Sequence, residues 1–238
     1  MKRSILIAAC AFLVGLTVAG QFLLRAKRPA SAPALAEGAF AALGGLRSIA
    51  AEIVWFRADR LQEEGRYVEL AQLASALAFM EPHTPEVWSY AAWNLAYNVS
   101  VMMATPEDRW RWVLAGLRLL RDEGLVYNPR SAALYRDLAW IFELKIGANI
   151  DSAAATYREK WAEIVRDVKA RGAWEELRMD PTEMARLEQA TGFDDWTDPQ
   201  LSAIYWGVKG DCRDIVQQAA VLYRRGHPSP DAGPVKAK

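Results

Sequence analysis

The stretch TPEVWSYAAWNLAYN, residues 84–98, contains the signals that start and orient an amphipathic helix. Thr84 can cap the first turn with its hydroxyl, and Pro85 needs no hydrogen-bond donor at the first helical position. The apolar residues that follow recur at relative spacings of 0, 3, 4 and 7, which places them on one helix face: Trp88, Ala91, Ala92 and Leu95. We therefore predict a helix that starts at Pro85 and packs through this face.

The same start signal occurs three more times, at Thr105-Pro106, Asp180-Pro181 and Asp198-Pro199. Asp151 is typical of another helix start and Gly172 of a helix end, which predicts a helix between them. Beyond the linker we find no convincing run of alternating apolar and polar residues, the pattern typical of a strand. The sequence therefore predicts an all-α fold.

The spacing of the apolar set also recurs along the chain. It occurs 47 residues later as Tyr135, Leu138, Ala139 and Phe142, and 34 residues earlier as Val54, Arg57, Ala58 and Leu61. Arg57 is a poor match, but the third member is alanine in all three sets. A small residue there lets the next helix approach closely, so we expect each set to belong to the first helix of a helix pair.

These sets, with Gly65, Tyr67, Ala71, Leu77 and Pro82 after the first one, resemble the tetratricopeptide repeat (TPR). The resemblance covers about residues 50–170, and the period of 34 matches that family whereas the period of 47 departs from it. It implies a TPR-like stack of antiparallel helix pairs, whose first helices line a concave groove. An irregular helical bundle is the alternative.

Further runs resemble an uncharacterised group of membrane-anchored bacterial proteins with such repeats: residues 61–67, 93–98, 106–112, 120–124, 195–196 and 203–206. The resemblance implies a bacterial envelope setting, and no catalytic residues can be transferred from it. We expect five segments: a membrane anchor or signal segment (1–28), a linker (29–45), TPR-like repeats (46–172), a C-terminal helical extension (173–225) and a disordered tail (226–238).

The N-terminal segment is an apolar run between basic residues. Residues 4–24 carry no charge, and a helix of that length is about 30 Å long, which matches the hydrocarbon core of a bilayer. We favour an uncleaved single-pass anchor in the bacterial inner membrane, with the body on the periplasmic side. The alternative is a signal peptide cleaved before Gln21.

Composition excludes several classes of protein. Lys plus Arg and Asp plus Glu both number 29, so the net charge is zero and argues against a nucleic-acid binder. With 2 Cys and 2 His, neither a disulfide-stapled scaffold nor a multi-Cys or His-rich metal centre is expected. No phosphate-binding loop or nucleophile motif occurs, and we expect no metal, no cofactor and no enzymatic activity.

Aligning the three sets places eight residues toward the expected groove: Trp55, Asp59, Glu63, Trp93, Tyr97, Arg136, Trp140 and Glu143. Aromatic rings beside a few charges suit peptide capture, although core packing explains most tryptophans in helical proteins. We therefore expect an interaction module that holds a protein or peptide partner. The alternative is a carbohydrate-active enzyme with Asp/Glu pairs and Trp platforms, which needs two carboxyl groups about 5–10 Å apart in one pocket.

Overall fold

The computed structural model describes residues 46–227, and every regular element within that range is helical. The expected anchor, the linker and nearly all of the expected tail lie outside the described residues. Among the described helices, none is both long enough and apolar enough to cross a membrane.

The helices follow one another with short connections. In chain order they are α3 (Leu46–Glu63), α4 (Tyr67–Met80), α5 (Pro85–Trp93), η1 (Asn94–Val99), α6 (Pro106–Arg118), η2 (Leu119–Gly124), α7 (Leu125–Tyr127), α8 (Ala132–Trp140), η3 (Ile141–Gly147), α9 (Ala154–Arg171), η4 (Trp174–Leu177), α10 (Pro181–Thr191), α11 (Pro199–Lys209) and α12 (Arg213–Gly226). η1, η2 and η3 are π-helical, and each directly continues the α-helix before it; η4 is a 3₁₀ turn.

All four predicted proline starts are confirmed, and three of the four capping side chains form the expected bond. Thr105, Asp180 and Asp198 each accept a backbone N–H of the first turn. Thr84 lies before α5 but its side chain forms no capping bond. α9 ends at Gly172, whose φ of 65° is left-handed and therefore favours glycine.

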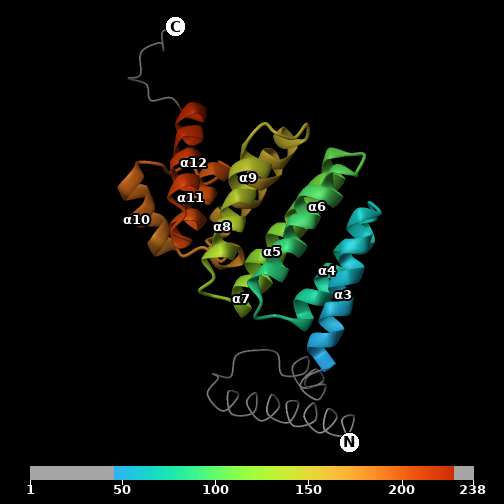
Figure 1. Ribbon diagram of the computed structural model, residues 1–238. Coiled ribbons are helices and arrows are strands. Elements are labelled where there is room, and N and C mark those ends of the chain that lie inside the picture. The colour runs from blue at the N-terminus through green and yellow to red at the C-terminus, as the bar shows by residue number, and fades with distance from the viewer. Residues whose placement is uncertain (1–45, 228–238) are drawn as a thin grey trace, which may run out of the picture.

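The helices form an array of neighbouring hairpins, and in Figure 1 the colour progresses from α3 at one side to the C-terminal helices α10, α11 and α12 at the other. α4 packs between α3 and α5, α5 packs on α8, and α8 packs on α11. α11 and α12 form a hairpin that covers α8, so the predicted C-terminal extension continues the array. Gly226, which we expected in the tail, is the last residue of α12.

Small residues bring neighbouring helices close together, as predicted. Ala58, Ala92 and Ala139, the third members of the three sets, are fully buried. Gly116 of α6 lies so close to α5 and η1 that an added Cβ would be 2.7 Å from the Ala92 carbonyl oxygen and 3.2 Å from the Ala96 Cβ. Gly207 likewise allows α11 to approach α12 closely, because a Cβ added at this position would lie 2.9 Å from Val216 Cγ2.

The core consists of rings and aliphatic side chains on the inner helix faces. Its largest fully buried members are Trp88, Phe142, Tyr157 and Trp161, which come from α5, η3 and α9. Phe142 and Trp161 pack edge to face with their centroids 4.7 Å apart. Cys212, at the turn between α11 and α12, is also buried, and its thiol donates to the Gly210 carbonyl oxygen at 3.3 Å.

Candidate functional site

Two tryptophans from equivalent helix ends meet at the surface of the array. Trp93 closes α5 and Trp140 closes α8, and each is followed directly by a π-helical segment. Their ring centroids lie 5.9 Å apart at an interplanar angle of 68°, although the residues are 44% and 38% exposed. Tyr97 of η1 stacks on Trp93 at 4.0 Å. We call Trp93, Tyr97 and Trp140 the aromatic cluster.

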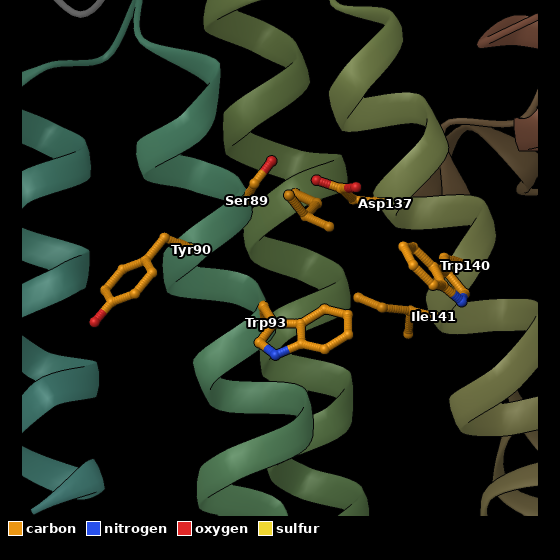
Figure 2. Close-up of a pocket in the computed structure, with 7 residues that line it drawn as sticks. Ser89, Tyr90, Trp93, Asp137, Trp140 and Ile141 are labelled. Carbon is orange, nitrogen blue, oxygen red and sulfur yellow. The ribbon is translucent and has the colours of Figure 1, made fainter. Parts of the chain in front are cut away.

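Beside the cluster lies a pocket of about 220 Å³, which we call the aromatic pocket. Its lining residues are Ser89, Tyr90, Trp93, Leu120, Asp137, Trp140 and Ile141. Figure 2 shows Ser89 and Asp137 at one end of this pocket, Trp93 at the opposite end and Trp140 at the side. Tyr97 covers one face of Trp93, so the part of the ring that lines the pocket lies elsewhere on the tryptophan. The pocket is therefore an apolar hollow with a carboxylate at one end.

Tyr90 connects the pocket to α3. Its ring lies 5.3 Å from the Trp55 ring, and its hydroxyl donates to the Gln62 Oε1 at 2.7 Å. Burial, and secondarily the charge of Asp59, raise the pKa of Tyr90. Through Tyr90, the surface formed by the aromatic cluster and the aromatic pocket continues onto α3, at Trp55 and Asp59. Glu63 is an exposed residue at the end of that helix. The aromatic surface spans α3, α5, η1 and α8.

Arg136 and Asp137 form an ion pair at the edge of the aromatic pocket, in which the Arg136 side chain is 53% exposed and the Asp137 side chain 19% exposed. Arg136 is exposed, and its guanidinium lies 3.4 Å from Asp137 Oδ1. Among the described residues, Asp137 Oδ2 accepts no hydrogen bond. At 3.4 Å the contact with Arg136 is long for a hydrogen bond, and the Oδ2 atom of Asp137 is left for a further donor.

Glu143 is buried rather than open to the groove. It is 3% exposed, and burial together with the negative charge of Asp214 raises the pKa of its carboxyl group to about 7. The backbone carbonyl oxygen of Glu143 accepts a hydrogen bond from the Gln200 side-chain amide at 3.0 Å, which links η3 to α11. Burial first, then the Glu143 and Asp137 carboxylates, raise the pKa of Tyr97. The Tyr97 hydroxyl is buried with no hydrogen-bond partner in the described part of the chain.

A second pocket, of about 370 Å³, is more polar, and its lining residues are Tyr97, Val101, Arg109, Lys145, Ile150, Asp151 and Ser152. The Lys145 ammonium lies 2.6 Å from Asp151 Oδ2 and 5.3 Å from the Tyr97 ring centroid. Asp151 also accepts from the Tyr157 hydroxyl and from the Ala153 backbone, and Arg109 lies 3.4 Å away. Burial opposes the ionisation of Asp151, but these bonds prevail and lower its pKa.

The site therefore contains residues that sequence reasoning missed. Tyr90 lies three positions before Trp93 on the same helix face, a spacing that could have indicated it. Asp137 lies one position after Arg136, in the helix aligned with α5. Asp151 was predicted only as a helix cap, and no sequence signal pairs it with Lys145.

Two acidic residues before α11, Asp195 and Asp198, contact the histidine that follows α12. His227 Nε2 lies 3.1 Å from Asp195 Oδ2, and Nδ1 lies 3.5 Å from Asp198 Oδ2. Within residues 46–227, no group of three or more His, Cys, Asp or Glu side chains is arranged to hold a metal ion. Each of the two pockets is lined by a single carboxylate, Asp137 in one and Asp151 in the other.

Comparison of the chain with protein-family models, with curated proteins and with solved structures finds no match.

Proposed function

We propose that this protein is a membrane-anchored, TPR-like interaction module that holds a peptide or protein partner in a bacterial envelope assembly. The observation that carries the proposal is the aromatic cluster, in which Trp93 and Trp140 touch each other while remaining 44% and 38% exposed. Binding surfaces are enriched in large aromatic residues, because a ring buries much area at a small cost in side-chain entropy.

The position of the cluster supports the same proposal. In stacked helix pairs, equivalent places on successive first helices form one continuous surface. Trp93 and Trp140 occupy such equivalent places, 47 residues apart in sequence, and Trp55 and Tyr90 extend the surface toward α3. An extended peptide can lie across such a surface and place side chains in pockets along it.

A carbohydrate-active enzyme is less well supported by the same pockets. Glycoside hydrolysis requires an acid and a second carboxylate that flank the scissile bond. The aromatic pocket provides Asp137 alone, and Asp151 in the polar pocket is held by Lys145, Arg109 and Tyr157. The geometry favours binding over this chemistry.

Site-specific photo-crosslinking in the native host tests the proposal. A photoreactive amino acid at Ser89, on the rim of the aromatic pocket, should give a discrete adduct, and the further change Trp140→Ala should remove it. The matched control is the same amino acid at Gln217, an exposed position on α12. An adduct of equal yield from Gln217, or one that persists in the Trp140→Ala protein, would contradict a partner site at the aromatic cluster.

A further inference from the structure

We infer that the aromatic pocket receives an arginine side chain of the partner. This inference rests on the proposed function, and it names the chemistry by which the partner is recognised. The guanidinium would lie against the Trp93 and Trp140 rings and donate to the Asp137 carboxylate.

The walls of the pocket favour a cation. Three of its lining residues are aromatic, Tyr90, Trp93 and Trp140, and the face of such a ring attracts a positive charge. Asp137 is its only charged lining residue among those described, and the Oδ2 atom of that carboxylate accepts no described hydrogen bond. The aromatic rings and the Asp137 carboxylate therefore both attract a positively charged side chain.

Other side chains fit this lining less well. An apolar side chain would displace water from Asp137 without offering a donor to its Oδ2 atom, and burying a charged oxygen without a hydrogen bond is costly. An acidic side chain would be repelled by Asp137.

Among cationic side chains, arginine suits the geometry better than lysine. Its guanidinium is planar, is weakly hydrated and can stack on a ring while its N–H groups reach a carboxylate. The pocket presents both surfaces, with the tryptophans at one end and side and Asp137 at the other end (Figure 2). The Arg136–Asp137 pair shows that this carboxylate already accepts a guanidinium at 3.4 Å.

Selection from a random-peptide display library against the purified full chain tests the inference. We expect peptides whose binding needs both Trp93 and Trp140 to share an arginine. Fluorescence anisotropy should then show that Asp137→Asn weakens such a peptide about 5- to 10-fold, as does arginine-to-leucine in the peptide. The two changes together should cost little more than either alone, because they remove the same contact. Asp167→Asn, at an exposed ion-paired position on α9, is the matched control and should leave affinity unchanged.

A second variant tests the sign of the charge. Arg136→Gln removes the chain's own guanidinium from Asp137, so the arginine peptide should bind at least as tightly as to the unaltered chain. Weaker binding to Arg136→Gln would show that Arg136 itself holds the peptide and does not compete with it for Asp137, and would overturn the inference.

The outcomes separate the inference from the proposed function. Peptides that need Trp93 and Trp140 but carry leucine, phenylalanine or lysine, and are insensitive to Asp137→Asn, would overturn the arginine site and leave the interaction surface intact. A selection without any peptide that depends on the two tryptophans would overturn both.

Discussion

Trp93 and Trp161 show the same side chain at the surface and in the core. Trp93 is 44% exposed, whereas Trp161 is 1% exposed and packs on Phe142. We predict that Trp93→Ala lowers the free energy of unfolding by only about 1–2 kcal/mol, since it loses a stacking contact and partial burial. Trp161→Ala should cost about 3–5 kcal/mol, the usual range for truncating a buried large aromatic residue.

Urea denaturation of the two variants and the unaltered chain measures the difference. If Trp93→Ala costs as much as Trp161→Ala, the Trp93 ring belongs to the core, and the aromatic cluster would not be a binding surface.

Glu143 links stability to pH. Because burial and Asp214 raise the pKa of its carboxyl group from 4.5 to about 7, the folded protein holds this proton more tightly than the unfolded chain does. The stability that the protonated group contributes is fully present below pH 4.5 and is lost as the pH rises through about 7. Glu143→Gln, which resembles the protonated form, should therefore be more stable than the unaltered chain at pH 8, by about 2 kcal/mol.

At pH 4 the same substitution should change the free energy of unfolding little, because Glu143 is then protonated in the folded protein and mostly protonated in the unfolded chain. Urea titrations at the two pH values give the difference. An equal effect of Glu143→Gln at pH 4 and pH 8 would mean that the Glu143 carboxyl has an ordinary pKa.

At the scale of the element, the close approach of α6 to α5 and η1 depends on Gly116. We predict that Gly116→Ala destabilises the fold by about 1–3 kcal/mol, because its Cβ would be 2.7 Å from the Ala92 carbonyl oxygen. This sign is opposite to the helix propensities, on which alanine is better than glycine by about 1 kcal/mol. The measurement is the urea midpoint.

Gly226→Ala is the matched control in α12, where the nearest atom to an added Cβ is Asp198 Oδ2 at an ordinary 3.7 Å. It should be neutral or stabilising. Stabilisation by Gly116→Ala as well would show that α6 has room to move away from α5.

The helix starts could be predicted from sequence because their chemistry is local. A capping side chain followed by proline acts within one turn, so the starts of α5, α6, α10 and α11 needed no tertiary information. The π-helical segments could not be predicted, because such turns are rare and no residue pattern in the sequence marks them. η3 includes Glu143, which was aligned toward the groove and is buried among η3, α11 and α12 instead.

Part of the candidate site could also be predicted from the sequence, through the repeated spacing of apolar residues. A repeated spacing identifies equivalent helix positions, and it paired Trp93 with Trp140 across 47 residues. It says nothing about residues that enter from elsewhere, such as Leu120 of η2 in the aromatic pocket or Asp151 against Lys145. Those contacts depend on how far each helix pair rotates relative to the next.

For the whole molecule, the proposed anchor predicts where the protein is found. Residues 4–24 lie outside the described range, and their uncharged run with basic flanks is the motive for the prediction. The full-length chain should sediment with membranes and remain there after a high-salt wash, since burial of the apolar run in lipid is insensitive to ionic strength. Recovery of a water-soluble chain that begins at Gln21 would show a cleaved signal peptide instead.

The buried thiol of Cys212, at the turn between α11 and α12, can report how often that turn opens. Burial and the charges of Asp214 and Asp211 raise the pKa of Cys212 despite the opposing effect of Arg136, so the reactive thiolate is scarce while the turn is closed. In a Cys10→Ser chain, a thiol reagent should modify Cys212 only when this last hairpin opens. The labelling rate would then measure how often the C-terminal end of the array opens by local unfolding. A partner that binds across α8 and α11 and stabilises their packing would lower this rate.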